Sequence, residues 1–272
     1  MKRIPLLPFA SATLTLALAA GCGGSSGPAT PATPATPTPT PVPMAPAVAP
    51  SGLALLFHMD EAAWDGTRDQ VRDASGQGHH GTSVAGATTA AGGRFGRAGS
   101  FPGGAGCVQI ADAPDLRPDT ELTVSAWLMS SGIGRGAAQG IAAKRVNYQQ
   151  ASAFAFFVGT TDRLTVDVDT EDDRFESGGA LASGRWYHTA FVYSGAARAV
   201  TVYQNGAAIG AHSEGASTIT AFPSPMWVGC LPEGAPSQGF AGLLDEVAVW
   251  HRALSASEVV ALANATGPIA DR

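Results

Sequence analysis

Past the first fifty residues, this chain alternates short apolar runs with glycine-rich turns almost to its end. The run Trp186–Tyr193 has a large residue at nearly every position, so both of its faces must be covered. Asn205-Gly206 separates two later runs, and this pair favours a hairpin because both turn positions need a positive φ. Many short strands of this kind predict two packed antiparallel sheets, that is, an all-β sandwich.

Only the end of the sequence is typical of a helix. Ser255 is a candidate N-cap, and Glu258 follows three residues later, which is the spacing of a capping box. Leu254 and Val259 are placed to form the hydrophobic contact that often accompanies it. We therefore expect one short helix that ends before Gly267-Pro268.

The first fifty residues have another composition. Two cations and the apolar run Ile4–Ala20 precede Gly21-Cys22, which indicates a secretory signal. Leu18–Cys22 resembles the bacterial lipoprotein processing box, and this resemblance implies that Cys22 is the first mature residue and carries lipid. An ordinary signal with an incidental cysteine is the alternative. Residues 22–50 are rich in Pro, Thr and Ala and predict a disordered, extended linker.

We accordingly divide the chain into a signal (1–21), a linker (22–50), one sandwich domain (51–266) and a short tail (267–272). The formal net charge is −6, and removal of the signal makes it −8 because Lys2 and Arg3 are lost. An acidic surface argues against nucleic acid as a partner and against electrostatic binding to anionic lipid. The predicted contact with a membrane is the lipid anchor alone.

The two cysteines beyond Cys22 are Cys107 and Cys230. An exported protein reaches an oxidising compartment, so we expect these two to form a disulfide. Two separate buried thiols are the alternative.

The apolar segments, taken in order, resemble the laminin-G-like, concanavalin A-like jelly-roll family. The resemblance is carried by the loop Asp73–Gly81, the strand Leu122–Trp127, the block Gly184–Gly206 and the closing segment Phe240–Val247. It implies a two-sheet sandwich whose members usually bind a ligand and do not transform it. We therefore expect a non-catalytic module, anchored at the bacterial cell envelope, that recognises a glycan or a surface protein through its loops or one face.

The same resemblance implies a structural calcium ion. Asp73 and Asp245 would give side-chain ligands, His79 a backbone carbonyl, and Asp60 is a further candidate. Calcium collects hard oxygen ligands of these kinds. The alternative is that these acids cap turns and accept backbone N–H bonds.

An enzyme on the same fold is the rival hypothesis. Asp167, Asp169 and Glu171 alternate along a predicted strand, so their carboxylates would share one face. This pattern resembles that of the laminarinase-type endoglucanases, in which two carboxylates about 5–5.5 Å apart act as nucleophile and acid. We favour the alternative, that this segment is an exposed polar strand end, over catalysis. A purely structural adhesion module is a third option for the function.

Aromatic residues could form a sugar platform. Four tryptophans lie in strand patterns and are expected in the core: Trp127, Trp186, Trp227 and Trp250. Trp64, Tyr148 and Phe175 lie in loops or at strand ends, where we expect exposure.

Overall fold

The computed structural model describes residues 48, 50–148, 150–168, 174–220, 222–233 and 236–272. One compact unit spans Met44–Arg272. The predicted signal, the lipid attachment at Cys22 and nearly all of the linker lie outside the described residues. Within the described ranges, no helix is both long enough and apolar enough to cross a membrane.

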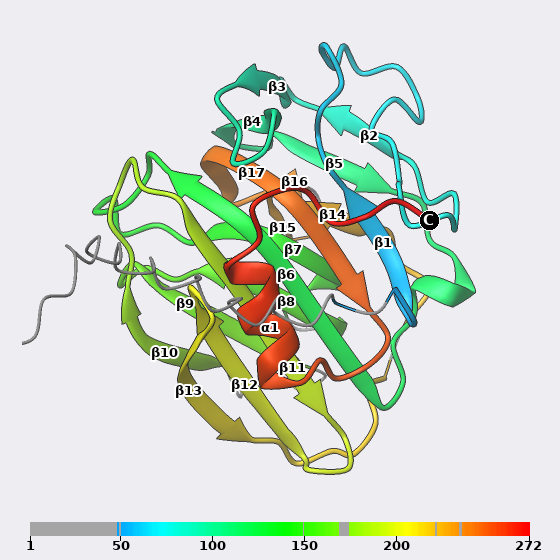
Figure 1. Ribbon diagram of the computed structural model, residues 1–272, viewed down its shortest axis with the longest axis vertical. Coiled ribbons are helices and arrows are strands. Elements are labelled where there is room, and N and C mark those ends of the chain that lie inside the picture. Colours follow the sequence, from blue (N-terminus) through cyan, green and yellow to red (C-terminus); the bar gives the residue numbers. More distant parts are fainter. Residues whose placement is uncertain (1–47, 49, 149, 169–173, 221, 234–235) are drawn as a thin grey trace, which may run out of the picture. The chain divides into compact units, whose positions relative to one another are not determined.

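Two antiparallel sheets form the domain, which confirms the predicted jelly-roll sandwich (Figure 1). The larger sheet has eight strands in the order β13-β12-β11-β6-β17-β4-β3, and β1 also pairs with β17. Its strands are β1 (Leu53–Phe57), β3 (Thr88–Ala91), β4 (Arg97–Gly104), β6 (Glu121–Ser130), β11 (Tyr187–Ser194), β12 (Ala199–Gln204), β13 (Ala207–Ser213) and β17 (Gly239–Trp250).

The second sheet has seven strands in the order β10-β9-β8-β7-β14-β5-β2. Its strands are β2 (Gly81–Val84), β5 (Cys107–Ile110), β7 (Gln139–Asn147), β8 (Gln150–Val158), β9 (Arg163–Val168), β10 (Phe175–Ala180) and β14 (Met226–Val228). A small hairpin of β15 (Leu231–Pro232) and β16 (Pro236–Ser237) packs against β7, and one 3₁₀ turn covers Pro114–Leu116.

The main core lies between the two sheets. Alternate residues of β6, including Val124 and Leu128, point into it and are fully buried. Phe156 of β8 meets Phe191 of β11 across the sandwich, with ring centroids 5.3 Å apart. Burial of each such side chain stabilises the fold by about 1.5–3 kcal/mol, so this layer contributes much of the driving force for folding.

The outer face of the eight-stranded sheet is covered by the helix α1 (Ala256–Ala263), which crosses in front of the strands (Figure 1). Both halves of the predicted capping box are present, since Ser255 Oγ accepts from the Glu258 N–H and Glu258 Oε2 accepts from the Ser255 N–H. Leu254 and Val259 are buried against this sheet together with Trp250. The helix therefore buries a second, outer apolar layer.

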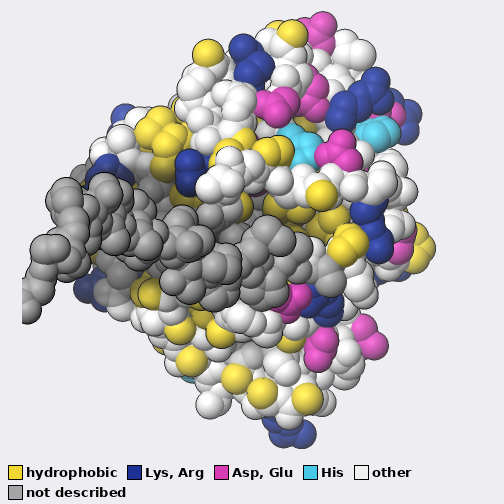
Figure 2. Space-filling view, in the orientation of Figure 1, with side chains coloured by type: hydrophobic (Ala, Val, Ile, Leu, Met, Phe, Trp, Pro, Cys, Tyr) yellow, Lys and Arg dark blue, Asp and Glu magenta, His cyan; other side chains and the backbone are white. Residues whose placement is uncertain are grey.

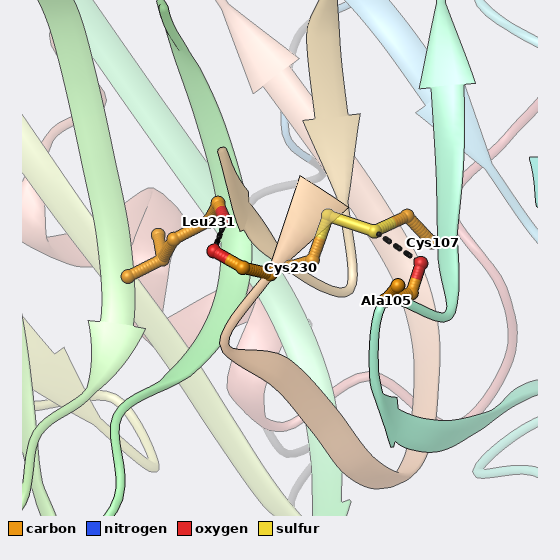
Figure 3. The surroundings of a disulfide bond; sticks show 5 residues. Ala105, Cys107, Cys230 and Leu231 are labelled. Carbon is orange, nitrogen blue, oxygen red and sulfur yellow. Dashed lines mark hydrogen bonds between the residues drawn. A yellow bond between two sulfur atoms is a disulfide. The ribbon is translucent and has the colours of Figure 1, made fainter. Parts of the chain in front are cut away.

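The predicted turns and the predicted disulfide are also confirmed. Asn205 and Gly206 adopt φ of 50° and 80° between β12 and β13. Cys107 and Cys230 form a disulfide that joins β5 to the segment leading into β15 (Figure 3). This bond fixes the base of the β15–β16 hairpin on the outer face of the seven-stranded sheet.

Candidate functional site

Two of the predicted calcium ligands, Asp73 and His79, lie together in one loop. Asp73 accepts hydrogen bonds from the backbone N–H groups of Leu56, Ser75 and His79 and from the Ser75 hydroxyl, at 2.8–3.0 Å. These four donors satisfy the carboxylate and fasten the loop to β1. The observed geometry is that of a loop anchor, and it offers a cation no open oxygen on Asp73.

The other two predicted ligands lie beside a different loop, residues 92–97. Asp60 Oδ1 accepts from the Arg97 N–H, and Asp245 Oδ2 accepts from the Phe95 N–H at 3.0 Å. Asp245 is fully buried, and its Oδ1 has no hydrogen-bond partner within the described part of the chain. Burial raises the pKa of Asp245 to about 7.

A cation would satisfy the open oxygen of Asp245, so this residue fits a calcium ligand, and Asp60 is bound to the same loop through the Arg97 N–H. In the described segments, however, no three His, Cys, Asp or Glu side chains gather as a metal site. Calcium at Asp245 would therefore draw most of its ligands from backbone carbonyls. The calcium ion remains a prediction.

Asp245 also belongs to a row on the outer face of the eight-stranded sheet. It pairs with Trp127 of β6, which pairs with His188 of β11. The Arg94 guanidinium lies 4.3 Å from the Trp127 ring, and His188 lies 5.4 Å from it. Burial lowers the pKa of His188 to about 3, so this imidazole is neutral. The row is packed beneath α1 and the C-terminal segment and forms no open platform.

The C-terminal segment is held to this face by a half-buried histidine. His58 Nδ1 lies 2.6 Å from Glu246, and Nε2 lies 2.7 Å from Asp271. Burial opposes the charge, but these two carboxylates raise the pKa of His58 to about 9. The Ile269 N–H adds a hydrogen bond to Glu246. Histidine and acidic side chains lie side by side on this face (Figure 2).

The outer face of the seven-stranded sheet carries a different cluster. Arg145 of β7 is nearly fully buried, and its guanidinium contacts Asp167 of β9 at 3.6 Å and Glu233 of the β15–β16 hairpin at 2.5 Å. Tyr148, 44% exposed, projects beside them, and the exposed Arg174 lies 5.9 Å from its ring. We call these five residues the Arg145 cluster. It combines an exposed aromatic ring with fixed donors and acceptors.

The Arg145 cluster includes one residue of the enzyme hypothesis. Asp167 is 3% exposed and paired with Arg145, so the expectation of an exposed polar strand end is wrong at this position. Asp169 and Glu171 lie outside the described residues. The structure therefore leaves the carboxylate pair of that hypothesis undefined.

The sequence did not single out Arg145 or Glu233. The available signal was a Lys-Arg pair inside the apolar segment Gly140–Val146, because a buried cation requires an acidic partner. Among the aromatics, Tyr148 is exposed as predicted, but Trp64 is only 5% exposed, because it packs edge-on against Phe101.

Trp127, Trp227 and Trp250 are buried as predicted. Trp186 lies just before β11 and is half-buried, so its assignment to the core is only partly right. Phe175 is also half-buried and stacks on His212, with ring centroids 5.5 Å apart.

The comparison with known families and structures gives a consistent fold. The model of the concanavalin A-like lectin/glucanases superfamily matches residues 102–260. Among curated proteins, none matches the chain.

Several solved structures share the sandwich. Domain 4 of AbnA, an extracellular arabinanase from Geobacillus stearothermophilus in complex with arabinotriose, is 20% identical, with a TM-score of 0.54, over 79% of this chain and 99% of that one. The binding domain of Paraclostridial Mosquitocidal Protein 1 is 17% identical, with a TM-score of 0.59, over 78% of this chain. A sialidase from Trypanosoma rangeli is 14% identical, with a TM-score of 0.57, over 80% of this chain.

This chain spans about half of the mosquitocidal structure (52%) and about a third of the sialidase (34%). At these identities the likeness concerns the fold.

Proposed function

The chain belongs to the concanavalin A-like lectin/glucanase superfamily, and from this premise we propose that it is a non-catalytic carbohydrate-binding module of the cell envelope. The observation that carries the proposal is the Arg145 cluster on the outer face of the seven-stranded sheet. The arabinanase domain on the same fold, seen with arabinotriose, supports a saccharide as the class of ligand.

The cluster has the chemistry that sugar recognition requires. Tyr148 offers an exposed ring on which the apolar face of a sugar can stack. Glu233 is partly exposed and can accept from sugar hydroxyls, while Arg145 holds its carboxylate in place. Because the donors and acceptors are fixed before the ligand arrives, binding costs little conformational entropy. The two arginines of the cluster balance its two acids in charge, which favours a neutral glycan.

Display at the cell surface follows from the first fifty residues. In this proposal Cys22 carries the lipid, and residues 23–47 space the domain from the membrane. Val48 and Pro50 lie beside Ile269 and Asp271, on the side of the domain covered by α1. The chain thus enters on the layer opposite the Arg145 cluster, which leaves that cluster open to a ligand.

A glycan array and calorimetry test the proposal. The secreted chain from residue 22, with Cys22→Ser to prevent lipidation, should bind an oligosaccharide and release no product. Tyr148→Ala should weaken this binding roughly tenfold, since an aromatic stacking contact contributes about 1 kcal/mol or more. Val260→Ala is the control, because Val260 is similarly exposed on α1.

Three results would count against the proposal. Unchanged affinity in Tyr148→Ala would remove the Arg145 cluster as the site. If the domain binds a surface protein and no glycan on the array, the ligand is a protein and not a saccharide. Hydrolysis of a bound glycan would favour the enzyme.

A further inference from the structure

A groove lies at the edge of the sandwich, far from the Arg145 cluster. It has a volume of about 210 Å³ and lies between residues 64–66 and the turn 84–88. This turn leads from β2 of the seven-stranded sheet to β3 of the eight-stranded sheet, so the groove opens where the chain crosses from one sheet to the other.

The walls of the groove are fixed by hydrogen bonds to one glutamine and one threonine. Gln70 Oε1 accepts from the N–H groups of Asp65 and Gly66, at 3.1 and 2.7 Å, and from the Ser83 hydroxyl at 3.2 Å. Thr88 Oγ1 accepts from the Trp64 N–H at 3.2 Å and donates to the Trp64 carbonyl at 3.1 Å. The two sides are therefore held at a set distance before any ligand binds.

The lining restricts the class of ligand. Trp64 is only 5% exposed and its indole N–H is engaged by Glu61, so it contributes little open surface. Val84 and Ala85 supply the accessible apolar side chains of the opposite wall. Asp65 is exposed at the rim, and hydrogen bonds from Thr67 hold the pKa of its carboxyl below the usual range. Among the residues that the structure describes, no Lys, Arg or His lines the groove, so this lining offers no counter-charge to an anion.

The volume is below the roughly 300–1,000 Å³ of sites for drug-sized ligands, so the groove suits a small molecule. We propose that this groove is a second saccharide subsite that takes a single neutral sugar ring. The Asp65 carboxylate accepts from neighbouring hydroxyls of the ring, and the apolar face of the sugar lies toward Val84 and Ala85.

The groove and the Arg145 cluster are separate. Ser83 lies on β2 and Asp167 on β9, which are five strand steps apart in the seven-stranded sheet. At about 4.8 Å per step the two positions are roughly 24 Å apart. A long glycan can reach both, but a single sugar cannot, so each can be tested alone.

Amide NMR of the secreted chain with Cys22→Ser tests the subsite. The probes are methyl β-D-glucoside, methyl β-D-galactoside and methyl α-L-arabinofuranoside. At least one should shift the amide signals of Gly66 and Gly86 in a saturable way. Asp65→Asn should weaken that binding about tenfold or more, because a hydrogen bond to a charged group is lost.

Asp69→Asn is the matched control. Asp69 lies in the same loop, pairs with Arg68 and does not line the groove, so this variant should bind as the parent does. Equal affinity in Asp65→Asn and the parent would overturn the proposal. So would the absence of shifts at Gly66 and Gly86 with every probe. If no probe shifts Gly66 or Gly86 but the Tyr148 amide shifts, the subsite is contradicted and the proposed function stands. If only the groove residues shift, the subsite is supported and the Arg145 cluster is contradicted as a sugar site.

Discussion

Arg145 Nη1 lies 3.6 Å from Asp167 Oδ2, and both side chains are nearly fully buried on the outer face of the seven-stranded sheet. Removal of one partner leaves the other charge buried and less compensated. We expect Asp167→Ala to lower the free energy of unfolding by about 3 kcal/mol, measured by urea denaturation. Asp167→Asn should cost less, since the amide keeps the volume. If both variants unfold with the same free energy as the parent, the Arg145–Asp167 pair does not stabilise the fold. Asp167 would then be a candidate catalytic residue again, as the enzyme hypothesis requires.

His58 lies between Glu246 and Asp271, and its pKa is about 9 in the folded protein against 6.5 without partners. A raised pKa means that the folded state binds the proton more tightly. The resulting stabilisation is complete below pH 6.5 and is lost as the pH rises through 9. We expect the parent to lose roughly 2–3 kcal/mol over this window relative to His58→Gln.

Urea denaturation of the two proteins between pH 6 and pH 10 measures the difference. Parallel pH profiles for parent and variant would show that His58 does not hold the C-terminal segment. The comparison removes the effect of other groups that titrate near pH 10.

The strands that the sequence predicted best are those with a strong local signal. Trp186–Tyr193 nearly coincides with β11, and Asn205-Gly206 forms the hairpin, because large residues and turn residues act within a few positions. β7 was missed, since Gln139–Asn147 is a run of small residues ending in Lys-Arg, whose strand character comes from its neighbours β8 and β14. Such pairing is tertiary and leaves little trace in the strand itself.

The candidate site was harder to predict for the same reason. Asp245 is fully buried, and its side chain lies on the outer face with Trp127 and not between the sheets. A bulge in β17 between Asp245 and Ala248 changes the register, and apolar alternation in sequence cannot reveal it. Arg145, Asp167 and Glu233 come from three separate segments, and only the fold brings them together.

The Cys107–Cys230 bond spans 123 residues of sequence. In the chain-entropy description, a loop of this length corresponds to about 4–5 kcal/mol of stabilisation. We expect a reductant to lower the free energy of unfolding by up to this amount, measured by urea denaturation. Cys107→Ala combined with Cys230→Ala should show the lower stability and no response to reductant. Equal stability of the oxidised parent and the double variant would contradict the prediction.

The bond also fixes the base of the hairpin that carries Glu233. Reduction should therefore weaken glycan binding at the Arg145 cluster even where the domain stays folded. Calorimetric titration of the folded, reduced protein measures this effect.

Asp245 supplies the test for calcium. Its folded pKa of about 7 lies above the ordinary 3.8, so ionisation destabilises the fold. That cost is absent below pH 3.8, grows as the pH rises and is complete above pH 7. A calcium ion at Oδ1 would offset it, and calcium at about a hundred times its Kd would add about 2.7 kcal/mol. We expect a Tm increase of about 5 °C or more at pH 8 and a much smaller one at pH 5.

Two variants separate the predicted ligands. Asp245→Asn should abolish the calcium response at pH 8. Asp73→Asn should lower the Tm, because Asp73 anchors its loop to β1, yet keep the calcium increment. Calorimetry with added calcium or with a chelator measures the Tm of the parent and of both variants. No calcium increment in the parent, with no metal found by elemental analysis, would remove the ion. An increment lost in Asp73→Asn and kept in Asp245→Asn would place the ion in the Asp73 loop, where four hydrogen-bond donors would have to move away from the carboxylate to admit it.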